Sequence, residues 1–237
     1  MHYLVIGATG FVRSHGVTLA LAIAAIAVVI STIPFVIAAI DYRQRDNGLA
    51  FLLLVSGVGV WNAMFVAQLL SPEPLIQVFF LALSVVGAVQ AGLGFFLFAT
   101  TASSTPNYLS RRSIYAAVSV LAGLNIVFAV TAPVHGLYWD VAPVNSVALG
   151  FAVIDPGPGY WFHTLLLVAL FGAGAMLFLD AWRARPGDPY PPAYVVTGVA
   201  RALAILASNL IAPGGLGVAP IVGASLTSVG WLQASRG

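Results

Sequence analysis

The stretch Leu19-Ala-Leu-Ala-Ile-Ala-Ala-Ile-Ala-Val-Val-Ile30 is apolar at every position, and it decides the fold class. A strand of a membrane β-barrel would instead alternate apolar and polar residues over segments of about 10 residues. An unbroken apolar run indicates a helix, because a helix satisfies its own backbone hydrogen bonds inside lipid. We therefore predict an all-α integral membrane protein.

The composition of the whole chain favours the same class. Of its 237 residues, 60% are hydrophobic and 7% are charged, whereas a soluble domain carries about 25% charged residues. The net charge of +2 is too small to indicate a nucleic-acid partner. All cations are arginine and cysteine is absent, a usage typical of a GC-rich prokaryote, and we expect an archaeal source.

Seven segments have the length of about 20 mostly apolar residues that a membrane-spanning helix needs. We expect the spans near 17–40, 48–70, 75–100, 113–133, 160–182, 193–212 and 216–234. Together they predict a seven-transmembrane helix bundle, with one transmembrane domain over residues 17–234. Residues 1–16 form an extracellular leader, and residues 134–159 form a long extracellular loop.

The arginines set the predicted orientation, because cytoplasmic loops of membrane proteins are enriched in basic residues. One side of the seven-span arrangement carries Arg43, Arg45, Arg111, Arg112, Arg183, Arg185 and Arg236. The other side carries Arg13 alone. We therefore place the N-terminus outside and the C-terminus in the cytoplasm of a multi-pass cell-membrane protein.

Polar and aromatic side chains gather at the two ends of the long outer loop. The candidate ligand-binding residues there are His135, Tyr138, Trp139, Asp140, Tyr160, Trp161 and His163. Three interpretations are open: rings that anchor at the membrane interface, an aromatic pocket with His and Asp anchors for a small ligand, or a metal site of both histidines and an aspartate. Because the histidines have no short ligand repeat, we predict no metal.

A second group of polar side chains falls inside the predicted spans. The candidates for an intramembrane polar network are Asn62, Gln90, Asn125, Arg201 and Asn209. Arg201 is ionisable and lies near the middle of a span, where a charge is costly and marks a functional candidate. It could be a buried polar tie, a side chain that snorkels to the inner surface, or part of a gate or ligand site.

Cofactor and enzyme chemistry find no support in the sequence. Covalent retinal needs a lysine for its Schiff base, and the chain has no lysine. We expect no cofactor. No Ser/His/Asp set, His-Glu-x-x-His motif or paired intramembrane aspartates are present, so we predict that the chain is not an enzyme.

The two ends of the outer loop also carry a recognisable pattern. It reads Thr-x-x-x-His followed by an aromatic residue and Trp, and later Gly-Pro-Gly-Tyr-Trp-x-His. This pattern resembles the seven-transmembrane sensor domain at the N-terminus of archaeal and bacterial histidine kinases. The residues of this pattern are Thr131, His135, Tyr138, Trp139, Gly157, Pro158, Gly159, Tyr160, Trp161 and His163. Three residues elsewhere in the chain also agree with the family, namely Trp61, Asn209 and Pro220. The resemblance covers approximately residues 20–234, and no kinase module follows it in the sequence.

The resemblance implies a membrane sensor that binds a small ligand near its extracellular face and relays a conformational signal to a cytoplasmic or membrane partner. The alternatives are a non-catalytic accessory subunit of a membrane complex and a transporter or channel. The expected partners are the lipid bilayer, an unidentified small ligand, and a second copy or other subunits of a membrane complex.

Overall fold

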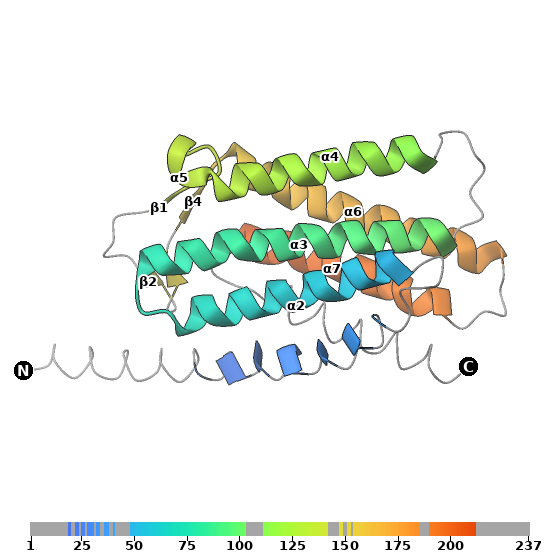
Figure 1. Cartoon of the computed structure of the whole chain (residues 1–237), viewed down its shortest axis with the longest axis horizontal. Helices are drawn as coiled ribbons and strands as arrows, with labels where there is room; N and C mark the ends of the chain where they lie inside the picture. Colours follow the sequence, from blue (N-terminus) through green and yellow to red (C-terminus); the bar gives the residue numbers. More distant parts are fainter. Residues whose placement is uncertain are drawn as a thin grey trace, which may run out of the picture.

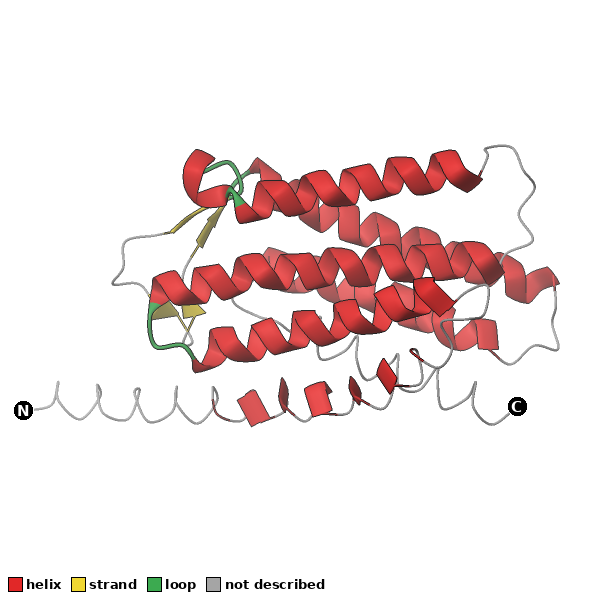
Figure 2. Cartoon of the chain, viewed as in Figure 1, coloured by secondary structure: helices red, strands yellow, loops and turns green. Residues whose placement is uncertain are grey.

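The computed structural model describes residues 48–102, 111–141, 147–148, 151–152, 154–184 and 190–211, together with scattered helical positions between residues 19 and 40. The chain is almost all helical (Figure 2). Its long helices are α2 (Gly48–Leu70), α3 (Pro74–Ala102), α4 (Arg111–Val130), α6 (Pro158–Ala184) and α7 (Tyr190–Ile211). They lie side by side with roughly parallel axes (Figure 1).

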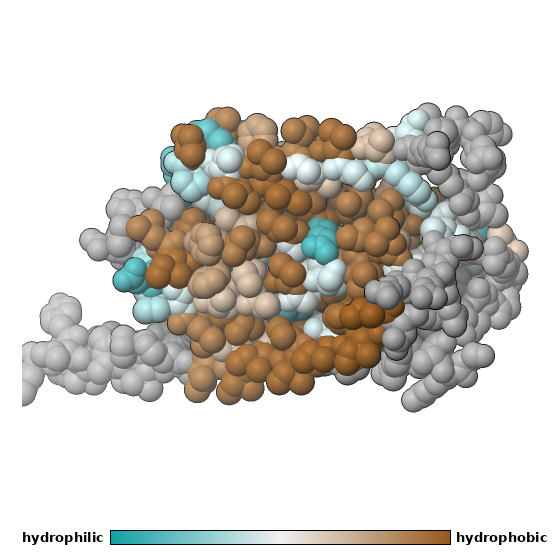
Figure 3. Space-filling view, viewed as in Figure 1, coloured by the Kyte–Doolittle hydropathy of each residue, from teal (hydrophilic) through white to brown (hydrophobic). Residues whose placement is uncertain are grey.

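The surfaces of these helices are suited to lipid rather than water. Helices α2, α3, α4 and α6 are each long and apolar enough to cross a membrane, and α7 contains a shorter apolar helix, Tyr194–Leu210. Large apolar side chains point outward, such as Val120 at 60% exposed and Leu165 at 63% exposed. The face shown in Figure 3 is accordingly mostly hydrophobic over the helices. A contiguous apolar surface of this kind marks a membrane protein.

Five of the seven predicted spans overlap these long helices. The expected span at 17–40 is described only at scattered helical positions, and the expected span at 216–234, the expected leader over residues 1–16 and both chain termini lie outside the described residues. The orientation of the termini therefore stays a prediction.

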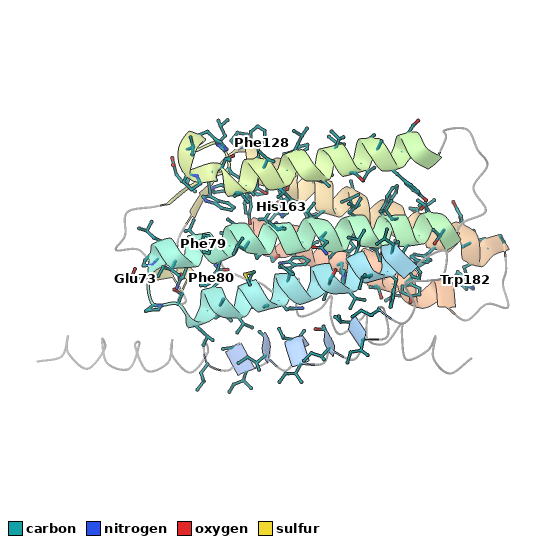
Figure 4. The ribbon with its side chains drawn as sticks, in the orientation of Figure 1. Glu73, Phe79, Phe80, Phe128, His163 and Trp182 are labelled. Carbon is teal, nitrogen blue, oxygen red and sulfur yellow. The ribbon has the colours of Figure 1, made fainter. Side chains whose placement is uncertain are left out.

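The bundle has two chemically different ends, marked in Figure 4 by Glu73 and Trp182. The junction of α2 and α3 lies at the Glu73 end, together with the short segments that connect α4 to α6 (Figure 1). Arg111 begins α4 and Arg183 lies in the last turn of α6 at the opposite end. We call the Glu73 end the outer end and the other the inner end, after the orientation predicted from the arginines.

The connection between α4 and α6 contains short strands where the sequence indicated only a loop. It begins with the single turn α5 (Ala132–His135) and continues with β1 (Trp139–Val141), β2 (Val147–Ala148), β3 (Phe151–Ala152) and β4 (Ile154–Pro156). Strand β1 pairs antiparallel with β4, and β2 pairs with β3. Strands of two or three residues are too short to show the alternating pattern that predicts a strand from sequence.

Helices α2 and α3 pack in direct backbone contact, and glycines permit it. A Cβ atom added to Gly87 would lie 2.4 Å from the backbone nitrogen of Trp61, and one added to Gly57 would lie 2.3 Å from that of Ala91. Gly94 makes a third contact of this type further along α3. Small residues at helix interfaces let membrane helices approach closely, so α2 and α3 form one tightly joined pair.

Candidate functional site

The segment between α4 and α6, which we call the outer connection, is fastened to the start of α6 by two backbone hydrogen bonds. The Gly157 N–H donates to the Tyr138 carbonyl at 3.0 Å, and the Gly159 N–H donates to the Leu137 carbonyl at 2.9 Å. A Cβ atom at Gly157 would lie 2.4 Å from the Leu137 carbonyl oxygen, and one at Gly159 would lie 2.8 Å from Tyr138 Cδ2. Both positions of the Gly-Pro-Gly sequence therefore require glycine, because a side chain would prevent the two segments from coming this close.

This fastening places the Tyr138 side chain in the interior of the bundle. Tyr138 is completely buried, and its ring centroid lies 4.6 Å from that of Trp139, 6.4 Å from that of Tyr160 and 6.1 Å from that of His163. Burial, with a smaller contribution from nearby Tyr160, raises the pKa of the Tyr138 phenol, and the neighbouring Asn125 amide partly opposes this shift. The hydroxyl therefore keeps its proton at all physiological pH values.

A buried hydrogen bond joins α6 to α4 beside this ring. His163 Nδ1 and Asn125 Oδ1 are 2.9 Å apart. Because an amide oxygen only accepts, Nδ1 carries the proton and donates it. The other polar atom of the amide, Asn125 Nδ2, and the Tyr138 hydroxyl are both buried, and neither completes a hydrogen bond within the described part of the chain. The α4 side of the site therefore holds polar groups that are buried but not fully satisfied.

A second set of hydrogen bonds joins α6 to α7. The Tyr160 hydroxyl donates to Asn209 Oδ1 at 2.8 Å, and Asn209 Nδ2 donates to Thr164 Oγ1 at 2.9 Å. Thr164 Oγ1 in turn donates to the Tyr160 carbonyl at 3.0 Å. We name the whole group the outer cluster; its members are Asn125, Tyr138, Trp139, Tyr160, His163, Thr164 and Asn209. It connects the outer connection, α4, α6 and α7 through one stretch of α6.

Thr164 is the member that sequence reasoning missed. A threonine inside an apolar helix most often bonds to the carbonyl four residues earlier, which explains its bond to Tyr160 but not its bond to Asn209. The signal that could have found it is its spacing from Tyr160, because residues four apart share one face of a helix.

The other sequence candidates of the outer loop lie outside the outer cluster. His135 is half-buried and supports the local turn: its Nδ1 accepts from the Leu137 N–H at 2.9 Å, and its Nε2 lies 3.2 Å from Thr131 Oγ1. Asp140 is exposed and lies directly opposite Asp155 in the β1–β4 pair. Trp161 is half-buried, and its ring centroid is 5.8 Å from that of Tyr160.

The positions of the described His, Asp and Glu side chains do not support the metal-site hypothesis. Among the described residues, no group of three or more His, Cys, Asp and Glu side chains is placed to hold a metal ion. The two histidines of that hypothesis have different roles, because His163 bonds to Asn125 and His135 bonds within its own turn.

Four of the five residues predicted to form an intramembrane polar network make hydrogen bonds with partners outside that set. Gln90 Nε2 donates to Ser56 Oγ at 2.7 Å, which links α3 to α2. Asn62 Nδ2 donates to the Val58 carbonyl of its own helix at 3.0 Å. Asn125 and Asn209 belong to the outer cluster. The single network of these five residues stays a prediction, because the rotation of each helix about its axis decides which polar side chains meet.

Arg201 lies in the bundle interior. It is completely buried, and its guanidinium carbon is 5.2 Å from the centre of the Phe171 ring, the geometry of a cation–π contact. The snorkelling alternative is wrong, since a fully buried side chain does not reach the membrane surface. The other two alternatives, a structural tie and a gate or ligand role, stay open.

A bundle of long apolar helices with a polar and aromatic cluster at one end defines a helical, multi-pass class of membrane protein. Within that class, the family described as the N-terminal 7TM region of histidine kinase matches residues 11–234 of the chain. The chain therefore belongs to this family, and the resemblance inferred from its outer loop is confirmed. The family is the sensor region of histidine kinases and not their catalytic module. No curated protein and no solved structure gives a significant match.

Proposed function

We propose that the chain is a cell-membrane sensor module that binds a small ligand at the outer cluster and relays a conformational signal to its cytoplasmic end. Two observations support this function. The family is a membrane sensor region, and the outer cluster joins the outer connection to three helices that run to the inner end. We propose no cofactor, and the partners are lipid, the ligand and an output protein.

The single observation that carries the proposal is that Tyr138, His163 and Asn125 lie next to one another: the Tyr138 ring is beside His163 and the Asn125 amide, and His163 bonds to Asn125. A change at Tyr138, which belongs to the outer connection, directly alters the surroundings of His163 on α6. His163 in turn holds α4 through Asn125. A ligand that favours one arrangement of these three side chains would therefore shift the position of α4 relative to α6.

Helix α4 is the element best suited to move. Many of its apolar side chains face outward, including Leu124 at 51% and Val127 at 57% exposed. Two side-chain contacts join α4 to other helices near its two ends. They are the Asn125–His163 bond toward the outer end and a 2.8 Å contact between the Thr100 and Tyr115 hydroxyls toward the inner end. Elements with few buried contacts open at low free-energy cost.

To test this function, the chain is joined at Gly237 to the catalytic module of a histidine kinase, and autophosphorylation is measured in membrane vesicles. Coupling between sites is typically worth fivefold or more. We expect His163→Ala and Asn125→Leu each to change autophosphorylation at least about fivefold and in the same direction. The shared direction follows because both substitutions break the same bond between α4 and α6.

The matched control is Leu165→Ala, which removes an exposed side chain from the same helix near His163. We expect it to leave autophosphorylation within about twofold of the unsubstituted fusion. If His163→Ala and Asn125→Leu also leave autophosphorylation unchanged while the fusions are folded, the outer cluster is structural and the proposed relay is wrong.

A further inference from the structure

Tyr138 differs from the other side chains of its segment. Leu137 before it is 49% exposed and Asp140 after it is exposed, whereas Tyr138 is completely buried. Its ring extends from the outer connection to the centre of the outer cluster, between residues of α4 and α6. The centre of the proposed sensing site is thus filled by a residue of the protein itself.

The surroundings of this ring match a phenol in shape and chemistry. Trp139 and Tyr160 both meet it edge to face, the geometry that aromatic pairs prefer. The Cα atom of Gly159 lies against the ring, because any Cβ atom there would come within 2.8 Å of it. At the polar end of the ring lies the amide of Asn125. These groups would hold any flat ring that carries a hydroxyl at one end.

Tyr138 fills this position without satisfying its polar end. The Tyr138 hydroxyl lies close enough to the Asn125 amide to interact with it, yet neither the hydroxyl nor Asn125 Nδ2 has a partner with the full geometry of a hydrogen bond among the described residues. The backbone that carries the tyrosine ring is held in place, because the Tyr138 carbonyl accepts from the Gly157 N–H and the Leu137 carbonyl accepts from the Gly159 N–H, so the ring is not free to improve this geometry. A phenol without that tether can adopt the geometry that a hydrogen bond to Asn125 requires.

The strand that directly follows Tyr138 is weakly paired. Strand β1 pairs with β4 over three residues only, and the central pair places Asp140 opposite Asp155. Both carboxylates are exposed. Like charges directly opposite each other destabilise an antiparallel pair, and isolated two-stranded pairs are marginal in stability. The β1–β4 pairing therefore adds little to the two bonds from Gly157 and Gly159, and those two bonds must break for the ring to be withdrawn.

We propose that Tyr138 is an internal plug of the sensing site, and that the ligand of this site is a small molecule with a phenol-like ring that takes the place of the Tyr138 side chain. This inference rests on the proposed function, since it names the ligand class of the same site. Removal of Tyr138 from the bundle would release Asn125 and His163 from their present arrangement and so start the relay.

The first experiment uses p-cresol, which is the tyrosine side chain as a free molecule, and toluene, which lacks the hydroxyl. Purified Tyr138→Ala and wild-type protein are titrated with each compound while thermal unfolding is followed. An aromatic compound can fill the space left by a deleted buried side chain. In the wild type, p-cresol must also compete with a tethered ring at millimolar effective concentration, so we expect at least about tenfold tighter p-cresol binding to Tyr138→Ala.

Toluene is the control for partition into detergent and for simple filling of space. We expect it to stabilise Tyr138→Ala far less than p-cresol does, because it cannot bond to Asn125. Equal p-cresol affinity for the wild type and Tyr138→Ala, or equal effects of p-cresol and toluene on Tyr138→Ala, would overturn the inference.

A second measurement needs no variant, and it stands if Tyr138→Ala does not fold. Hydrogen exchange of the Gly157 and Gly159 amides is measured in the wild type, because both amides donate to the segment that carries Tyr138. At about 10 mM p-cresol, above the effective concentration of a short tether, we expect both amides to exchange several times faster, with α2 amides unchanged. Unchanged exchange of Gly157 and Gly159 would contradict the plug.

The failures of this inference and of the proposed function are distinguishable. If p-cresol binds as expected but does not change autophosphorylation of the kinase fusion, the plug is supported and the sensor function is wrong. If His163→Ala changes autophosphorylation but p-cresol neither binds nor alters exchange, the sensor function is supported and the phenol-like ligand is wrong.

Discussion

Gly87→Ala is expected to lower the free energy of unfolding by about 3 kcal/mol, the upper part of the range for overpacked cores. The added Cβ atom would lie 2.4 Å from the Trp61 nitrogen and 2.9 Å from the Gly57 carbonyl oxygen. Both are backbone atoms, so a side-chain rotation cannot relieve the contact and α2 and α3 must separate. The measurement is thermal or denaturant unfolding of the purified protein in detergent, compared with the wild type.

The matched control is Gly59→Ala, on the neighbouring helix, where an added Cβ atom meets no heavy atom within 4 Å. Alanine is favoured over glycine in a helix interior by about 1 kcal/mol. We therefore expect Gly59→Ala to be neutral or stabilising, which is the opposite sign to Gly87→Ala. Two variants of equal stability would show that α2 and α3 are not in backbone contact.

Gly159→Ala is expected to expel the Tyr138 ring from the outer cluster and to cost about 2 kcal/mol, comparable with exposing one large buried side chain. The new Cβ atom would lie 2.8 Å from Tyr138 Cδ2 and 3.2 Å from the Leu137 carbonyl oxygen. Since Gly159 lies in the first turn of α6, the substitution suits the helix, and a cost arises only from the outer connection. Unfolding and hydrogen exchange of residues 137–141 measure the two effects.

Two comparisons make this prediction specific. Gly172→Ala, in the same helix, meets no heavy atom within 4 Å and is expected to be neutral or stabilising. In a Tyr138→Ala background, most of the clash at Gly159 is absent, so the cost of Gly159→Ala should fall to less than half. Equal costs in both backgrounds would argue against contact between Gly159 and the Tyr138 ring.

The long helices were predictable from sequence because apolar length alone decides whether a segment favours lipid. The segments expected at 48–70 and 160–182 correspond to α2 (Gly48–Leu70) and α6 (Pro158–Ala184) within two residues at each end. The short strands were not predictable. Their pairing depends on how Gly157 and Gly159 bring the two ends of the connection together.

The candidate site was predictable in its residue types and only partly in its contacts. Tyr138, Trp139, Tyr160 and His163 were all expected in one site, because they gather at one membrane face, and the structure brings them together. The partners of His163 and Tyr160 were not predictable. Asn125 and Asn209 lie on other helices, and a single sequence does not contain the rotation and axial shift of one helix against another.

Arg201 is a charged residue whose direction the sequence prediction left open. Its position eight residues inside the predicted span made snorkelling to the inner surface a reasonable hypothesis. The structure instead turns its side chain inward against Phe171. Thr197 and Ser208, four residues before and seven residues after Arg201, are also buried, so the spacing of the polar residues in α7 indicates its inward face.

The most direct test of the central claim, a sensor site on the outer face of a membrane bundle, uses the absence of cysteine from the chain. Single cysteines are introduced as Asp155→Cys beside the outer cluster and as Ala184→Cys at the inner end of α6, both at exposed positions. Intact cells are treated with a maleimide that does not cross membranes. The account predicts that Asp155→Cys reacts in intact cells, while Ala184→Cys reacts only after permeabilisation. Reaction of Ala184→Cys in intact cells, with Asp155→Cys protected until permeabilisation, would contradict it.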